Sequence, residues 1–217
     1  MGNVLDRCAR AARLLLAAIA VALAGFGSAG AAIISYDFDT FADSTALTDQ
    51  YAGLHFTHAT VLRAGVSLNE VSFPPRSGEG VVFDDGGGIV ITFDTLASTV
   101  AGYFTYFTDI GGITLSAYDS ADNLLAVVTS THTVNTADGS GDPGSVPNEL
   151  LSVTAPGDLI ARIVVRGMPD GGSLVLDDLS VTTAAVAVPE PGTLPLVLGA
   201  LALALLVRGR RSGNRHA

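Results

Sequence analysis

The chain has 217 residues and a net charge of −10, with one cysteine, no lysine and no tryptophan. Its segment 33–188 is more acidic than the whole, because four arginines stand there against 19 acidic residues, a net charge of −15. So few cations cannot neutralise phosphates, which excludes nucleic acid and anionic lipid as partners. Divalent cations and uncharged polymers suit such a surface better. The segment is long enough for one domain with its own core.

The first 32 residues predict a secretory signal peptide. Three arginines precede an apolar run over 14–24, and small residues follow it. The expected cleavage region for signal peptidase comprises Ala29, Ala31 and Ala32. An uncleaved N-terminal anchor helix is the alternative. After cleavage the exported chain has no cysteine, so no disulfide supports it.

The segment 33–183 reads as a series of short strands. Runs rich in β-branched and aromatic residues are separated by clusters of Gly, Asp, Asn and Pro. Several runs alternate in polarity, as over 113–117, and a long loop interrupts the series at 134–148. About ten strands without intervening helices predict an all-β fold, a single jelly-roll-like β-sandwich.

The end of the chain predicts a short membrane segment. A linker over 184–191 leads into an apolar helix over 192–207, whose continuous apolar run is shorter than the ~20 residues that usually span a bilayer. Arginines in the final segment, 208–217, place that end in the cytoplasm and the sandwich outside.

Pro189, Glu190 and Pro191, followed by the short helix and the arginines, resemble the PEP-CTERM sorting signal. The resemblance implies a Gram-negative bacterium and recognition of the tail by a membrane-embedded exosortase. It also implies an inner-membrane-anchored precursor and a mature form at the cell surface or in the extracellular matrix. An ordinary single-pass anchor with a proline-rich stem is the alternative.

The middle of the chain also resembles modules of this family. The stretches "SLNEVSFPPRSGEGVVFDDGGGIVITF" and "GGSLVLDDLSVT" look like β-rich modules of PEP-CTERM proteins, which are associated with matrix and exopolysaccharide. Some ice-binding proteins carry the same type of tail, so the tail does not decide the function of the domain.

Four aspartates are candidates for a structural calcium site. Asp37 and Asp39 share one face of the expected first strand, and Asp177 and Asp178 lie on the expected last strand. If these strands are neighbours, the carboxylates could meet and bind Ca²⁺, which takes six to eight oxygen ligands. The jelly-roll carbohydrate-binding modules that "SLVLDDLSV" resembles imply calcium at about this place. Ordinary solvent-facing aspartates are the alternative.

An aromatic run raises the question of sugar binding. On a strand, Tyr103 and Phe107 would share one face and Phe104 and Tyr106 the other. One pair is expected in the core. The other pair, which we take to be Tyr103 and Phe107, could stack on sugar rings or cover a second sheet.

The sequence contains no clear catalytic motif. The sequence has no G-x-S-x-G motif, and His55 and His58 would point to opposite faces of a strand, so neither a nucleophile elbow nor a zinc pair is expected. No carboxylate pair stands out for glycoside hydrolysis. The sequence therefore favours an exported, non-catalytic surface or matrix protein that could bind exopolysaccharide. The alternatives are a purely structural surface protein, a secreted glycan-active hydrolase and an ice-binding protein.

Overall fold

The computed structural model describes residues 31–109, 111–157 and 159–183, and the predicted signal peptide and sorting tail lie outside them. All regular secondary structure in these residues is β-strand. No helix within them is long and apolar enough to cross a membrane. The prediction of an all-β fold is confirmed.

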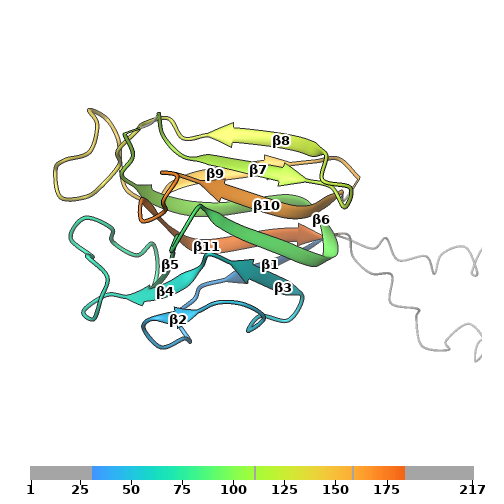
Figure 1. Ribbon diagram of the computed structural model, residues 1–217, viewed down its shortest axis with the longest axis horizontal. Helices are drawn as coiled ribbons and strands as arrows, with labels where there is room; N and C mark the ends of the chain where they lie inside the picture. Colours follow the sequence, from blue (N-terminus) through green and yellow to red (C-terminus); the bar gives the residue numbers. More distant parts are fainter. Residues whose placement is uncertain (1–30, 110, 158, 184–217) are drawn as a thin grey trace, which may run out of the picture. The chain divides into compact units, whose positions relative to one another are not determined.

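Eleven strands make up the domain (Figure 1). They are β1 (Ala32–Tyr36), β2 (Thr45–Ala46), β3 (Leu54–Thr57), β4 (Thr60–Arg63), β5 (Gly80–Phe83), β6 (Ile89–Tyr106), β7 (Thr114–Tyr118), β8 (Leu124–Thr129), β9 (Glu149–Thr154), β10 (Ile160–Arg166) and β11 (Leu174–Thr183).

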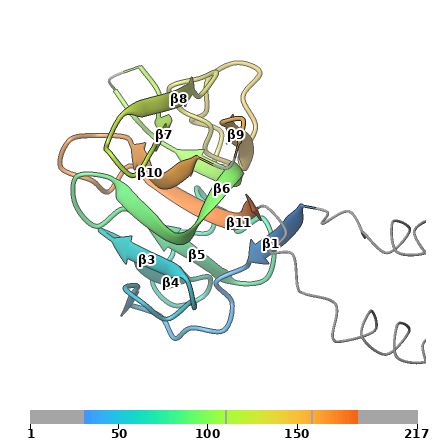
Figure 2. The ribbon, with the colours of Figure 1, turned by 90° about the vertical axis from the view of Figure 1, so that its right-hand side faces the viewer.

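The strands form two layers that share β6. The first layer runs β2-β4-β5-β11-β6-β9, with β1 beside the second half of β11. The second layer runs β3-β6-β10-β7-β8. Residues 89–93 of β6 belong to the second layer and residues 97–106 to the first, so this long strand joins the layers (Figure 2). The predicted sandwich is confirmed.

Alternation along the strands builds the core between the layers. In the first half of β6, Ile89, Ile91 and Phe93 are buried, whereas Thr92 and Asp94 are exposed. Successive strand residues point to opposite faces, so every second residue enters the core. In the second half of β6 the buried hydrophobic residues fall on even rather than odd positions, and this alternation sends Phe104 and Tyr106 inward.

Two long connections gather at the end of the sandwich opposite the one where β1 begins and β11 ends (Figure 1). They are the β4–β5 loop, 64–79, and the β8–β9 loop, 130–148, which contains the predicted loop. The hydroxyl of Ser72 donates to Asp138 (2.7 Å), and the N–H of Ala137 donates to the carbonyl of Ser72 (2.9 Å). Each loop therefore braces the other.

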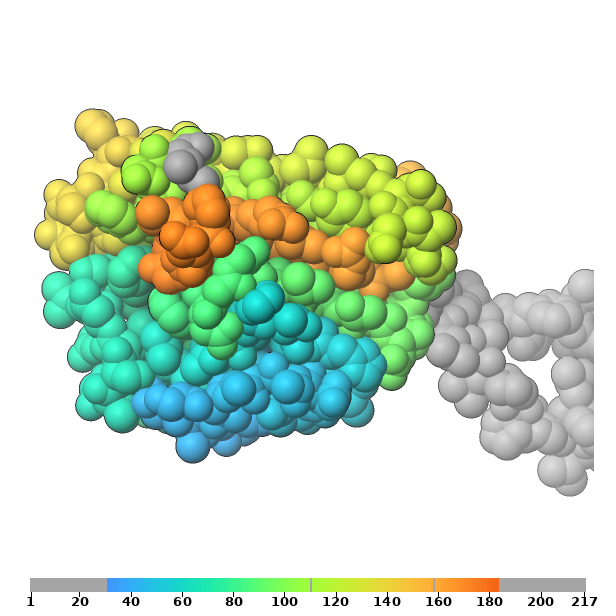
Figure 3. All heavy atoms as spheres, in the orientation of Figure 1, coloured from blue at the N-terminus to red at the C-terminus, as the bar shows by residue number. Residues whose placement is uncertain are grey.

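A buried carboxylate ties two glycine-rich turns together at the same end. Asp84 accepts the N–H groups of Ser173 and Leu174 at 3.0 and 3.1 Å, and burial raises its pKa to about 6. A Cβ at Gly171 would lie 2.6 Å from the nitrogen of Gly86, so only glycine fits this approach. Figure 3 shows the orange segment around 170 against the green segment that follows Asp84.

Candidate functional site

The outer face of the first layer carries a flat patch of small side chains across β1, β11, β6 and β9. We call it the hydroxyl floor and define it as Ser35, Thr99, Ala101, Ser152, Thr154, Ser180 and Thr182. Strand register orders these residues into two rows. One row is Thr182–Thr99–Thr154, and the exposed Ile33 of β1 lies beside Thr182 at its end. The other row is Ser35–Ser180–Ala101–Ser152.

Alternation places these side chains outward. Val100, Val153 and Val181, which follow or precede floor residues, are at most 3% exposed and belong to the core. The residues between them therefore face away from the core. None is charged and none is larger than threonine. The hydroxyls of Thr99 and Thr154 bond to each other at 3.0 Å across the strands.

A loop segment, 74–77, borders the floor on one side, and we call it the wall. At one end the side-chain amide of Asn148, just before β9, donates to the carbonyl of Pro74 at 3.2 Å. At the other end the N–H groups of Arg76 and Ser77 donate to Asp177 Oδ2 on β11, at 2.7 and 3.0 Å. The wall therefore runs across β9, β6 and β11.

An aromatic ring lies in the angle between floor and wall. Tyr103 is two residues along β6 from Ala101, and the guanidinium carbon of Arg76 lies 4.7 Å from its ring centre. Leu150, directly opposite on β9, is 54% exposed. This angle combines an aromatic ring, a cationic hydrogen-bond donor and an apolar side chain beside a polar floor.

Buried Asp177 holds the wall in place. It is 1% exposed, and its own oxygens also accept the N–H of Asp178 at 2.7 Å. Burial raises its pKa to about 6, although the N–H donors of the wall pull in the opposite direction. Asp178 sits at a bulge with φ of 46°, and its carboxylate accepts the hydroxyl of Ser77 (2.8 Å).

The four aspartates of the predicted calcium site are placed differently from the sequence prediction. Asp37 and Asp39 do not lie on the first strand, because β1 ends at Tyr36 and the left-handed φ of Phe38, 62°, turns the chain. Asp39 instead accepts the N–H groups of residues 79 and 80, at 2.7 and 2.8 Å. Asp177, contrary to the solvent-facing alternative, is buried.

No metal is required to explain these contacts. Within the described residues, no group of three or more His, Cys, Asp or Glu side chains is arranged to hold a metal ion. Calcium at Asp37, Asp39, Asp177 and Asp178 stays a prediction.

The two aromatic residues predicted to bind a ligand lie in different places. Tyr103 borders the floor, whereas Phe107 lies beyond the end of β6, 50% exposed, where it bridges to Val134 in the β8–β9 loop. Sequence reasoning missed the floor itself. Its signal was present as small residues at every second position of three separated segments, 99–101, 152–154 and 180–182.

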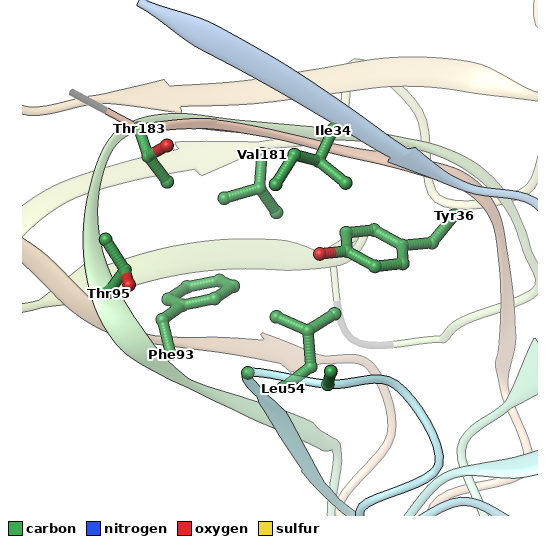
Figure 4. A pocket seen from close by; sticks show the side chains of 9 residues that line it. Ile34, Tyr36, Leu54, Phe93, Thr95, Val181 and Thr183 are labelled. Atoms are coloured by element: carbon green, nitrogen blue, oxygen red, sulfur yellow. The ribbon is translucent and has the colours of Figure 1, made fainter. Parts of the chain in front are cut away.

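Two clefts are weaker candidates for a ligand site than the floor, because one is small and both are lined mainly by apolar side chains. One, of about 80 Å³, opens between the layers and is lined mainly by apolar side chains such as Leu54, Phe93 and Val181, with the hydroxyl of Tyr36 pointing in (Figure 4). It is smaller than the ~150 Å³ cavity that holds benzene in another protein. A second, of about 260 Å³, lies under the β4–β5 loop and includes Phe73 and Phe83.

Two titratable side chains with shifted pKa values, Tyr106 and His55, are engaged in structural contacts. Tyr106 is fully buried and donates to Glu149, and burial raises its pKa. His55 lies between the carboxylates of Asp49 and Asp94, at 2.6 and 2.8 Å, and these hydrogen bonds raise its pKa. Neither Tyr106 nor His55 lines either cleft, whereas Tyr36, whose pKa is raised by burial, lines the smaller one.

No protein-family model and no curated protein matches the chain. Among solved structures, the K2 cleaved adhesin domain of Lys-gingipain is similar, at 14% identity and a TM-score of 0.46, covering 70% of this chain and 99% of that one. A family 29 carbohydrate-binding module is similar at 13% identity and a TM-score of 0.37, covering 74% and 99%.

The CBM22-1 xylan-binding domain of Xyn10C from Paenibacillus barcinonensis is similar at 10% identity and a TM-score of 0.39, covering 74% of this chain and 100% of that one. Because these TM-scores lie below 0.5, the description of the fold and of the site rests on the geometry of this chain alone.

Proposed function

We propose that the protein is an exported, non-catalytic surface or matrix protein that binds polysaccharide on the hydroxyl floor. The observation that carries this proposal is the floor itself, with Tyr103 and Arg76 beside it. Sugars offer many hydroxyls and apolar ring faces. Hydroxyl side chains can donate to and accept from the former, and an aromatic ring with its apolar neighbours suits the latter.

The absence of charge on the floor supports the same ligand class. The domain has 19 acidic residues, yet the seven floor positions carry none. A surface that only needed to stay soluble would not require an uncharged patch four strands wide. An uncharged partner avoids both the repulsion of the acidic surface and the cost of stripping water from a charge.

The acid groups argue for binding without catalysis. Asp84 and Asp177, whose pKa values are raised to about 6, are at most 1% exposed. The carboxylate oxygens of each accept hydrogen bonds from backbone N–H groups, so neither residue is available to transfer a proton to a substrate. Strongly shifted carboxylates in this domain thus serve to fix turns and the wall.

The route to the surface is proposed from the sequence. The segment 1–32 would direct export, and Pro189, Glu190 and Pro191 with the helix 192–207 would present the tail to an exosortase. Replacing these three residues with alanine would then leave unprocessed precursor in the inner membrane.

Binding of the full chain to a polysaccharide array, followed by affinity electrophoresis, tests the proposed activity. Tyr103→Ala should weaken binding about tenfold, because it removes the ring at the angle of floor and wall. Tyr118→Ala is the matched control. Tyr118 also lies under an arginine, Arg162, at 4.3 Å, but on the outer face of the second layer.

The control should bind as the unaltered chain does. Equal losses in both variants would move the binding site away from the floor. A chain that binds no polysaccharide on the array would refute the proposal, and a purely structural surface protein would take its place.

A further inference from the structure

We infer that the ligand of the hydroxyl floor is a flat, uncharged polysaccharide chain that lies across the strands, along the wall. This inference rests on the proposed function and specifies its ligand. It follows from the shape of the floor, the direction of the wall and the charges next to it.

The floor is flat because every side chain on it is short. Serine, alanine and threonine fill both rows on β11, β6 and β9, and the exposed Ile33 on β1 ends one row with an uncharged aliphatic side chain. Strands lie about 4.8 Å apart, so the four strands give a surface roughly 14 Å wide. A ribbon-like chain contacts such a plane along its whole length, whereas a helical chain contacts it only at intervals.

The wall sets the direction of the ligand. It is anchored at Asn148 beside β9 and at Asp177 on β11, so it runs across the strands and parallel to the rows of the floor. A chain laid along the strands would meet the wall after two rows. A chain laid along the rows meets Tyr103 and Leu150 on one side and hydroxyls beneath.

The charges beside the wall favour an uncharged ligand. Arg76 is the cation at this angle, but its backbone is held by Asp177, and Asp178 follows directly. The wall thus has two carboxylates in contact with its residues 76 and 77 and one guanidinium, so it offers no net positive charge to an acidic sugar. The remaining negative charge of the domain repels such a polymer within a Debye length of about 8 Å.

The guanidinium retains its role as a hydrogen-bond donor. In the described part of the chain, Arg63 and Arg162 form ion pairs at 2.7 and 2.8 Å, and no carboxylate pairs with the guanidinium of Arg76. Its five N–H groups can therefore bond the hydroxyl and ring oxygens of a neutral sugar that stands against the wall.

Three soluble polymers separate shape from charge in affinity electrophoresis of the full chain. Glucomannan is extended and uncharged, laminarin is helical and uncharged, and polygalacturonate is extended and acidic. We expect glucomannan to bind at least about tenfold more tightly than the other two. Equal or tighter binding of laminarin or polygalacturonate would overturn the inference and leave the proposed function standing.

Placing a bulky residue on the floor is the second test of this inference. Ala101→Tyr should abolish glucomannan binding, because the new ring would rise from the middle of a row. Ser116→Tyr, at a half-buried central position of the second layer's outer face, should bind normally. If Ala101→Tyr does not fold, Ser152→Tyr replaces it at an exposed position of the same row.

Retained binding in a folded floor variant would overturn the inference. Failure of all three polymers and of the polysaccharide array together would instead overturn the proposed function, so the two failures are distinguishable.

Discussion

The two outer faces of the sandwich are built from the same alternating strands and differ in what their outward residues do. On the first layer, most outward positions of β11, β6 and β9 next to the wall are short hydroxyl side chains that leave a flat surface. On the second layer, outward positions on β10 are Arg162, Val164 and Arg166. Val164 faces away from the core and is nevertheless only 2% exposed, so longer neighbours cover it.

On the second layer, long side chains cover the outer face of the sheet. On the first layer, the outer face stays accessible to a ligand. Arg162 lies over Tyr118 and pairs with Asp122 at 2.8 Å, so its side chain closes over its own sheet. Serine and threonine are too short to cover their neighbours in this way. The first face depends on a distant loop for its one raised border, and breaking that border is the most direct way to test the comparison.

The largest expected effect on stability comes from Gly78→Ala. Gly78 has φ of 51°, and a Cβ there would lie 1.8 Å from Asp39 Oδ2, the side chain that binds the N–H groups following the wall. We expect a loss of about 3 kcal/mol in the free energy of unfolding, together with weaker polysaccharide binding. Thermal unfolding and affinity electrophoresis measure the two effects.

Gly65→Ala is the control within the same loop. Gly65 has φ of 76° but nothing within 4 Å of its Cβ position, so only the backbone strain of about 1–2 kcal/mol applies. Equal destabilisation by both changes would show that the contact with Asp39 does not hold the wall.

The pH dependence of stability is the next largest effect. Asp84 and Asp177 have pKa values of about 6 in the folded chain against 3.8 for the free side chain, so the folded state binds more protons between these values. Stability therefore falls as pH rises from about 4 to 6, and the melting temperature should be several degrees higher at pH 5 than at pH 7.

Single substitutions test whether the pH dependence of stability comes from the buried carboxylates of the wall and the turns. Asp177→Asn should flatten the pH profile and weaken the wall, whereas Asp122→Asn, an exposed carboxylate that pairs with Arg162 in the second layer, should leave the profile intact. A melting temperature that rises from pH 5 to pH 7 would contradict the assignment of both buried carboxylates.

Local pattern was sufficient for the fold class and for part of the core. Period-two alternation assigned Phe104 and Tyr106 to one face and Tyr103 to the other, because a strand's faces are set by neighbours along the chain. It was insufficient for Asp37 and Asp39, because the left-handed turn at Phe38 depends on packing in the folded domain.

The candidate site needed information that no single stretch contains. The floor exists only because β11, β6 and β9 are neighbours in register, and the wall depends on a bond between residues 74 and 148. The bulge at Asp178 shifts the register by one residue, which brings Ser180 rather than its neighbour opposite Ala101. A sequence pattern does not specify such long-range pairings.

The smallest expected effect concerns the hydroxyls alone. Thr99→Val with Thr154→Val keeps the shape of one floor row and removes the hydroxyl pair at 3.0 Å. We expect affinity for polysaccharide to fall about threefold to tenfold, because a few hydrogen bonds with a net value of roughly 1 kcal/mol each would be lost. The free energy of unfolding should change little.

The second face supplies the matched control, Thr114→Val with Thr129→Val, whose threonines also face each other across two strands. That control should bind normally, since its threonines lie on the face that carries Arg162 and Arg166. If both double variants lose affinity equally, the hydroxyls of the floor contribute nothing specific and its flatness alone would explain binding. If only Thr99 and Thr154 matter, the difference between the two faces is one of chemistry as well as of shape.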